Sequence, residues 1–318
     1  MTVEPRLSID DLRKNLGDPA AEVRQLALMN LEDDAATDHV EALLGAIADE
    51  DATVRRLAIG LLEEIGDSRA VGPLVTALED DDQVVRDAAA SALREFRGPD
   101  AATPLIEAIN HPKVEVRRSV IVALREIRDS RAVPALIAAL ADPSPEVRRE
   151  AVVTLAYLRH ADAVESLRRL VRDSDSGVRR LVAGALSFWG GPALLPDFIG
   201  LMSDEDWQVR VEAAIVLGRN KLSQAIPVLL DALDDPYWQV QKEAAAALGR
   251  LGAIAAIPAL MAALSREAAD VRKAAAYALG ELRASDAIEA LTLCLADPDA
   301  EVRKAATRTI QAIRDAHA

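Results

Sequence analysis

The fold of this chain is decided by the stretch Asp142-Pro143-Ser144-Pro145-Glu146-Val147-Arg148-Arg149-Glu150-Ala151-Val152-Val153-Thr154-Leu155, whose pattern returns every 31 residues. The recurring kernel is an Asp, then Val-Arg five residues later, then a run of small apolar residues. Val-Arg begins at positions 23, 54, 85, 116, 147, 178, 209, 271 and 302, and Val240-Gln241 fills the remaining place. A repeat of this period indicates a solenoid in which each repeat packs on its neighbours.

Each repeat is predicted to contain two helices. Residues 132–140 have helical apolar spacing, and Pro134 falls in the first turn, where its missing N–H costs nothing. Pro143 ends this first helix, because the residue before a proline is pushed out of the helical region. A second helix is expected from about Ser144 to Leu158, with an apolar stripe made by Val147, Ala151, Thr154, Leu155 and Leu158. We name the two helices of a repeat A and B.

Composition limits both the core and the partners. Of the 318 residues 51% are hydrophobic but only 3% are aromatic, so Ala, Leu, Val and Ile must fill the core and helices can approach closely. The net charge of −15 disfavours nucleic acid and anionic membranes and favours basic or apolar partners. One cysteine, Cys294, excludes an intramolecular disulfide. Without an apolar run of about 18 residues or a leader-like start, we expect a cytoplasmic protein that does not enter a membrane.

The register predicts one continuous solenoid over residues 1–318, with ten repeats and about twenty helices. The ends are expected to act as caps, over about residues 1–16, where Ser8 is a candidate N-cap, and about residues 299–318. One junction differs from the others: Phe188-Trp189-Gly190-Gly191-Pro192 places two glycines after a B helix, where they permit positive φ.

The repeat resembles a known family. Asp-Pro-x-x-x-Val-Arg with its small-residue run, together with Asp-Ser-Arg-Ala-Val-Pro-Ala-Leu-Ile at 129–137, is similar to the HEAT-like repeat of the phycobilisome (phycocyanobilin) lyase type. The resemblance covers essentially the whole chain. It implies an all-α, right-handed α-solenoid of helical hairpins, with A helices on the convex side and B helices lining the concave side. Proteins with such repeats include bilin lyases, cofactor-assembly accessory proteins and scaffolds.

The recurring arginine admits two interpretations. An anion-binding row is one; the other is a structural ladder in which each guanidinium bridges aspartates of its own and the adjacent repeat. The aspartate five residues before the Val recurs in eight repeats, with His111 and Arg266 as exceptions, and this coincidence favours the structural ladder.

The predicted working surface is the concave side of the B helices, at the second, fifth and sixth positions after the Val. The second position is basic in seven of ten repeats, and the fifth and sixth are largely apolar. An exposed apolar groove beside a basic ridge is typical of a binding site. The predicted partner-binding residues are Leu28, Met29, Ile59, Ile121, Val122, Val152, Val153, Ile215, Tyr277, Arg118, Arg149 and Arg180. Alternatively, neighbouring B helices bury the apolar positions.

Aromatic residues supply the candidate cofactor-binding site. Trp207 and Trp238 occupy the same place in successive repeats and should lie side by side, with Tyr237 adjoining. They form either a ledge for a planar ligand or a seal between repeats. The four histidines share no helical face, and no phosphate loop or nucleophile motif is present, so we predict no metal site, no catalytic residues and no resident cofactor.

These observations favour a non-enzymatic scaffold or adaptor that binds a helical or acidic segment of another protein in its concave groove. We expect it to be a monomer. The alternative is a bilin-lyase-like or cofactor-maturation protein that handles a tetrapyrrole for a client. Only in that case would the chain be an enzyme, with a lyase-type activity that attaches a chromophore.

Overall fold

The computed structural model describes residues 9–31 and 39–317, and these form α-helices joined by turns and short 3-10 helices, with no strand among them. The A helices are α1 (Ile9–Leu16), α4 (Val40–Ala46), α6 (Val71–Ala77), α8 (Pro99–Ala108), α10 (Val133–Ala139), α12 (Val164–Arg169), α14 (Leu195–Leu201), α16 (Ile226–Asp231), α18 (Ile257–Ala263) and α20 (Ile288–Leu293). The B helices are α2 (Ala21–Met29), α5 (Ala52–Ile65), α7 (Gln83–Leu93), α9 (Val114–Ile127), α11 (Pro145–Leu158), α13 (Ser176–Leu186), α15 (Trp207–Arg219), α17 (Trp238–Arg250), α19 (Ala269–Glu281) and α21 (Ala300–His317). The prediction of an all-α solenoid of helical hairpins is confirmed.

The repeat that contains the opening stretch forms as its residues predict. Pro134 lies in the first turn of α10 and Pro145 in the first turn of α11. A 3-10 turn, Ser130–Ala132, precedes α10, because the Asp129 side chain accepts a hydrogen bond from the Arg131 N–H at 2.8 Å. The A helix therefore begins one residue later than the periodicity predicts.

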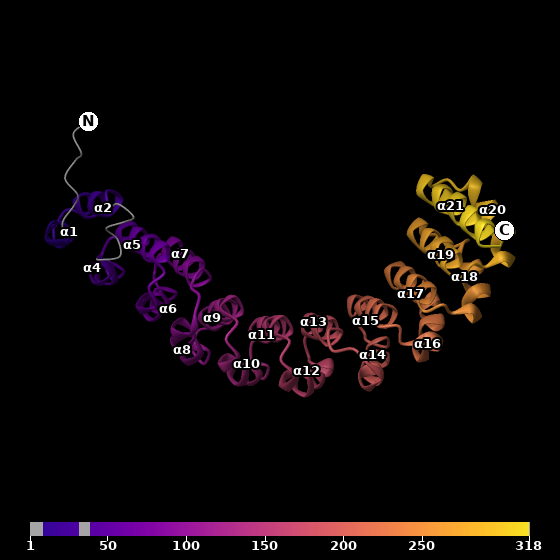
Figure 1. Ribbon diagram of the computed structural model, residues 1–318, viewed down its shortest axis with the longest axis horizontal. Coiled ribbons are helices and arrows are strands. Elements are labelled where there is room, and N and C mark those ends of the chain that lie inside the picture. The colour runs from indigo at the N-terminus through magenta and orange to yellow at the C-terminus, as the bar shows by residue number, and fades with distance from the viewer. Residues whose placement is uncertain (1–8, 32–38, 318) are drawn as a thin grey trace. The chain divides into compact units, whose positions relative to one another are not determined.

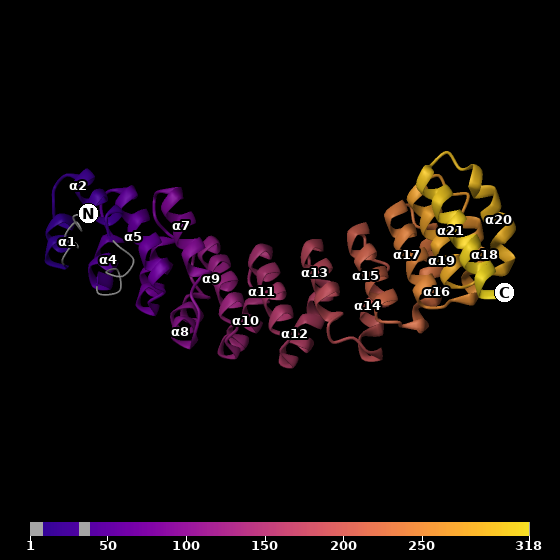
Figure 2. The same cartoon turned by 45° about the horizontal axis from the view of Figure 1, so that its top comes forward.

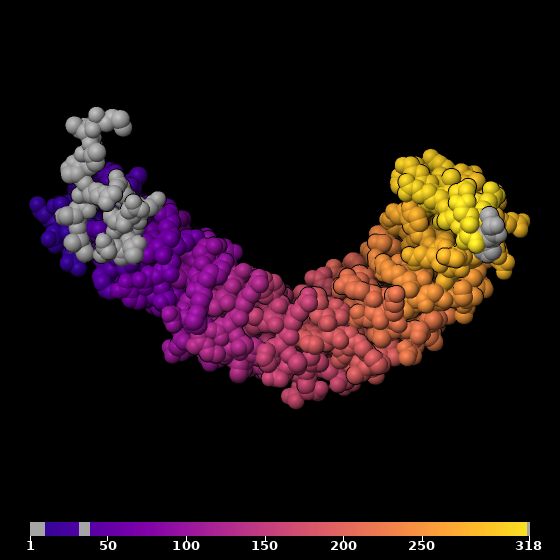
Figure 3. Space-filling view, viewed as in Figure 1, coloured from indigo at the N-terminus to yellow at the C-terminus, as the bar shows by residue number. Residues whose placement is uncertain are grey.

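The chain divides into two units, one ending at Ala163 and one beginning at Val164. Within the first unit, α2, α5, α7, α9 and α11 form one layer of B helices, and α1, α4, α6, α8 and α10 form the A layer (Figures 1 and 2). The second unit has the same two layers. Within each unit, side chains fill the spaces between the ribbons (Figure 3). These cores contain the predicted stripe: Val147, Ala151 and Leu155 are fully buried.

A ladder of arginine–aspartate pairs, which we call rungs, joins successive repeats. In each intact rung, Nε and Nη2 of the arginine donate to both carboxylate oxygens of the aspartate 25 residues later, at 2.7–2.9 Å. The intact rungs include Arg24–Asp49, Arg55–Asp80, Arg117–Asp142, Arg179–Asp204, Arg210–Asp235 and Arg272–Asp297. Nη1 donates instead to carbonyls of its own repeat, as Arg117 does to His111 at 2.8 Å. The structural interpretation of the arginine column is confirmed.

Small residues allow close helix packing in the second unit. A Cβ added to Gly218 of α15 would lie 2.9 Å from Ala247 Cα of α17, and one added to Gly249 would lie 2.9 Å from Ala278 Cα of α19. Real Cβ atoms do not approach backbone this closely, so these glycines set the spacing between B helices. The close approach expected from the aromatic-poor composition is thus present.

Glycines also shape two junctions. Gly190 and Gly191 have φ of 56° and 86°, as the sequence predicts. Gly98, which precedes Pro99 at the start of α8, has φ of 92° and was not singled out from the sequence. At the chain ends, the expected N-cap Ser8 lies outside the described residues, whereas Thr307, Arg308 and Gln311 of α21 are exposed.

Candidate functional site: the exposed face of the B helices

The candidate site is the set of B-helix side chains that point away from the A helices, which we call the B face. At about 100° per residue, the second and sixth positions after the Val lie nearly opposite the middle of the buried stripe. The fifth position lies only about 100° from that middle, on the flank that meets the next B helix. The sequence treated all three positions alike, and the structure separates them.

The fifth-position residues are wrong as partner-binding candidates. Leu28 and Val152 are each 1% exposed, and Ile59 and Ile121 are fully buried. They are buried because each B helix packs on other B helices of its unit as well as on its A helix. The alternative that neighbouring helices bury the apolar positions therefore holds for this column.

The sixth-position residues reach the surface. Met29 is 66% exposed and Tyr277 is 41% exposed. Val122, Val153 and Ile215 are half-buried, so part of each apolar side chain contacts solvent. Met29, Val122 and Val153 belong to the first unit, and Ile215 and Tyr277 to the second.

The second-position cations form the predicted ridge unevenly. Arg118 and Arg180 are exposed and Arg149 is half-buried. The lysines of the second unit are paired within their own helices: Lys242 with Glu243 at 3.0 Å, and Lys273 with Asp270 at 2.8 Å. Arg118, in contrast, makes no ion pair or hydrogen bond through its side chain with the described residues.

One acidic residue on this surface was missed from the sequence. Glu212 of α15 is half-buried, with Oε1 3.1 Å from where a Cβ on Gly184 of α13 would lie. Burial raises the pKa of the Glu212 carboxyl, while Arg219 and Arg180 act in the opposite direction. The one signal for this contact in the sequence is Gly184, because a residue without a side chain leaves room for the Glu212 side chain to lie across α13.

The aromatic ledge is differently arranged from the prediction. Trp207 stacks on Tyr237, with ring centroids 5.8 Å apart and planes inclined by 13°. The guanidinium of Arg210 lies 5.6 Å from the Tyr237 ring centroid, so the stacked pair lies beside the Arg210–Asp235 rung. This arrangement fits the sealing role left open above, although Tyr237 and Trp238 remain 44% and 42% exposed.

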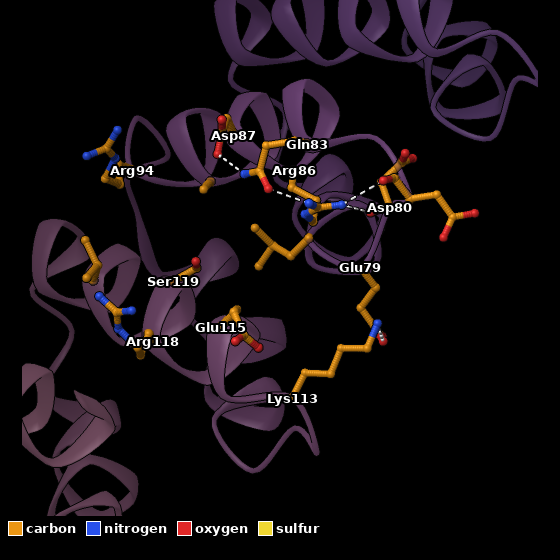
Figure 4. A pocket seen from close by; sticks show the side chains of 14 residues that line it. Glu79, Asp80, Gln83, Arg86, Asp87, Arg94, Lys113, Glu115, Arg118 and Ser119 are labelled. Carbon is orange, nitrogen blue, oxygen red and sulfur yellow. Dashed lines mark hydrogen bonds and ion pairs between the residues drawn. The ribbon is translucent and has the colours of Figure 1, made fainter. Parts of the chain in front are cut away.

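A cleft lies between two B helices of the first unit, α7 and α9 (Figure 4). Its volume is about 950 Å³, and its lining is mostly charged. Of the predicted residues it brings together Arg118 and Val122. Sequence analysis did not predict this cleft, although the replacement of a ladder aspartate by His111 marks its position.

Other kinds of site find little support in the part of the chain that the structure describes. Residues 9–31 and 39–317 contain no group of three or more His, Cys, Asp or Glu placed to hold a metal ion. Cys294 is 6% exposed, and burial raises the pKa of its thiol. None of the described helices is both long and apolar enough to cross a bilayer.

Stacked helical hairpins with an exposed B face define an α-solenoid repeat protein. The HEAT-repeat family matches this chain over residues 9–94, 73–142, 133–206, 195–280 and 257–318. The chain belongs to the HEAT-repeat family. Its assignment to the phycobilisome-lyase type within that family remains a prediction, and no curated protein matches the sequence.

Solved structures share the fold at low sequence identity. An engineered protein is 23% identical with a TM-score of 0.53, covering 96% of this chain and 98% of that one. YibA of Escherichia coli is 21% identical with a TM-score of 0.56, covering 80% and 96%. Kap95p, in a structure with RanGDP, is 13% identical with a TM-score of 0.65, and the match covers 96% of this chain but only 49% of Kap95p.

Proposed function

We propose that this protein is a non-enzymatic interaction scaffold that binds a partner protein on its B face. The observation that carries the proposal is the combination, on one exposed stripe, of apolar and cationic side chains in a chain of net charge −15. In the first unit, Arg118 and Val122 lie one helical turn apart on α9, and Arg149 and Val153 repeat this on α11. Apolar contact with a charged neighbour suits an amphipathic helix or an acidic segment.

Solved structures of similar fold also support this proposal. The solved HEAT-repeat structures with a similar fold include Kap95p with RanGDP and Kap95 with Nup1, in which the solenoid is seen with a protein partner. The proposal treats the ten repeats as one monomeric, cytoplasmic solenoid whose groove is its concave side. It requires no cofactor or metal.

Site-specific photocrosslinking tests the proposal. A photoreactive phenylalanine analogue replaces Val153 on the B face or Glu107, which is exposed on the A helix α8. We expect one host protein to crosslink from position 153 and not from position 107. A double change of Ile121 and Val152 to Asp is unsuitable, because both side chains are buried and the chain would unfold.

The matched loss-of-binding variant is Val122→Asp with Val153→Asp. Both side chains are only half-buried, so we expect the circular dichroism spectrum to be retained and the captured partner to be lost. Equal capture from positions 153 and 107, or capture that the double variant leaves unchanged, would contradict binding on the B face.

The exposed rings of Tyr237 and Trp238 favour one second candidate, handling of a tetrapyrrole for a client protein. Exposed aromatic faces stack on planar ligands, and nearby cations bind propionate groups. Titration with bilin or haem should then quench tryptophan fluorescence with saturation, and Trp238→Ala should weaken that quenching at least tenfold. Quenching that is linear in ligand, or equal in the variant, would exclude this candidate.

A further inference from the structure

The cleft between α7 and α9 lies where the arginine–aspartate ladder is interrupted. Arg86 of α7 is the ladder arginine of its repeat, but the residue 25 positions later is His111 instead of an aspartate. The helices also differ here, because α7 packs more closely on α5 than on α9. The cleft thus lies at the one position in the first unit where the residue 25 positions after a ladder arginine is not an aspartate.

His111 keeps one role of the missing aspartate and lacks the other. Its Nδ1 accepts a hydrogen bond from the Lys113 N–H at 3.2 Å, as Asp142 Oδ1 accepts one from the Ser144 N–H at 2.8 Å. Its Nε2 lies 2.9 Å from Glu79 Oε1. The turn is therefore preserved while the carboxylate for Arg86 is absent.

Arg86 retains the rest of the rung geometry. Its Nη1 donates to the carbonyls of Asp80 and Asp81 at 2.5 and 2.9 Å, which fixes the guanidinium as in the intact rungs. Nη2 donates to the amide oxygen of Gln83, whose nitrogen is held by Asp87 at 2.7 Å (Figure 4). Nε has no acceptor among the described residues. The Nε and Nη2 atoms, which bind an aspartate in the intact rungs, have only the neutral amide of Gln83 as a partner in Arg86.

Two more arginines line the same cleft. Arg94 and Arg118 are exposed, and their side chains make no hydrogen bond or ion pair with the described residues. Arg94 interacts electrostatically with Glu63 and Arg118 with Glu146, without a hydrogen bond or an ion pair in either case. Exposed guanidinium groups that lack a bidentate partner can bind an anion. Lys113 adds less, because it pairs with Glu79 at 2.9 Å.

The lining also decides which anion fits. Five carboxylates line the cleft with the arginines: Glu79, Asp80, Asp81, Asp87 and Glu115. Asp80 is paired with Arg55 and Glu79 with Lys113, and the other three repel a polyphosphate such as nucleic acid. A single carboxylate is planar and matches the bidentate geometry that Nε and Nη2 show in every intact rung. Glu115, which has no partner among the described residues, can receive a cation from the same segment.

The second interruption of the ladder differs from the one at Arg86. Where Arg266 replaces the aspartate, the arginine of the preceding repeat is itself replaced, by Gln241, which donates to the Asp235 carbonyl at 2.6 Å. Arg266 pairs with Asp234. Both partners changed there, so no guanidinium edge is left open.

We propose that the cleft between α7 and α9 binds a single carboxylate side chain of a partner protein, in a segment that also carries a cation for Glu115. The carboxylate takes the place beside Arg86 that an aspartate fills in the intact rungs, and Arg94 and Arg118 line another part of the same cleft. This inference rests on the proposed function, and it names the group of the partner that the scaffold recognises.

The test follows the arginine Nε–Hε signals of the full-length protein, labelled with ¹⁵N-arginine, by NMR. The probe is the capped tripeptide acetyl-Ala-Glu-Ala-amide, and the matched control peptide has Gln in place of Glu. Arg86→Gln assigns the Arg86 signal. His111→Asp supplies the missing carboxylate from within the chain, and a raised melting temperature shows that its rung has formed.

We expect a saturable shift of the Arg86 signal with the Glu peptide and none with the Gln peptide. Binding, followed through the Arg118 signal, should weaken at least tenfold in Arg86→Gln, and also in His111→Asp if its melting temperature rises. The proposal is overturned by an absent shift in the unchanged protein, by undiminished binding in Arg86→Gln, or by equal binding of inorganic phosphate. Because the titration needs no partner protein, its failure is separate from a failure of the photocrosslinking.

Discussion

The contribution of one ladder rung can be measured by changing Arg179 to Gln. In the Arg179–Asp204 rung, both hydrogen bonds are 2.7 Å long, and each side chain is 9% exposed. The chain itself shows what Gln does at this position, because Gln241 keeps a hydrogen bond to the carbonyl six residues before it, at 2.6 Å. The substitution therefore removes the ion pair while it keeps a bond to the main chain.

The expected loss follows from the carboxylate that remains. Removal of one partner of a buried ion pair costs about 3–5 kcal/mol, because the other charge stays buried without compensation. Asp204 keeps the hydrogen bond from the Asp206 N–H at 2.9 Å and is slightly exposed, so we expect a loss of about 3 kcal/mol, at the lower end of this range. The matched control, Arg86→Gln, leaves no aspartate behind and should cost less than about 1 kcal/mol.

Thermal and urea unfolding, followed by circular dichroism, measure the difference. At roughly 2 °C per kcal/mol for a chain of this size, Arg179→Gln should lower the melting temperature by about 6 °C. Asp204→Asn added to Arg179→Gln should recover part of the loss, because it removes the abandoned charge. If the two variants lose the same free energy of unfolding, within about 0.5 kcal/mol, the ion pair does not stabilise the fold. The ladder arginine would then contribute only through packing and its hydrogen bonds to the main chain.

Three further predictions concern spacing and charge. Gly218→Ala should destabilise the protein by about 1–3 kcal/mol in urea unfolding, because its Cβ would meet Ala247 at 2.9 Å. Gly60→Ala, within α5 and with nothing within 4 Å of the added Cβ, should stabilise it by about 0.5–1 kcal/mol; losses for both would argue against the spacing role. Burial raises the pKa of Glu212 in the folded state, so stability falls as pH rises past the carboxyl's unfolded pKa; Glu212→Gln should stabilise the protein at pH 7 and not below about pH 4. The hydrogen bond from Arg272 lowers the pKa of Asp297 in the folded state, so ionised Asp297 stabilises the fold above its unfolded pKa, and this stabilisation is lost below about pH 4. Asp297→Asn should therefore lose less stability on acidification than the unchanged protein, and an equal loss would contradict this.

The fold could be predicted because its determinants are local and recur. Val147, Ala151 and Leu155 fall on one helical stripe, and Pro134 and Pro145 mark the beginnings of helices. The ladder was also accessible, because Arg179 and Asp204 sit at positions that keep the same offset in most repeats. Such a pattern specifies which neighbour each residue meets without knowledge of the three-dimensional structure.

The candidate site was only partly predictable, because its limits depend on the spacing between helices. Leu28 and Ile121 lie on the flank of their helices, outside the stripe that faces the A helix, and packing against adjacent B helices buries them. The stacking of Trp207 on Tyr237 depends in the same way on the distance between successive repeats. The cleft at Arg86 did have a signal, the replacement at His111, but a single departure from a pattern does not show whether the structure closes or opens there.

The constant offset of the ladder has a consequence for how such a chain can change its length. Each intact rung connects residues 25 apart within a period of 31, so excision or duplication of one whole period rejoins an arginine to an equivalent aspartate. Unequal recombination at any such boundary therefore produces a shorter or longer protein with matching junctions. The length of the protein can therefore vary by whole repeats. A departure from the pattern, such as Arg86 with His111, is duplicated or lost together with the two repeats that contain it.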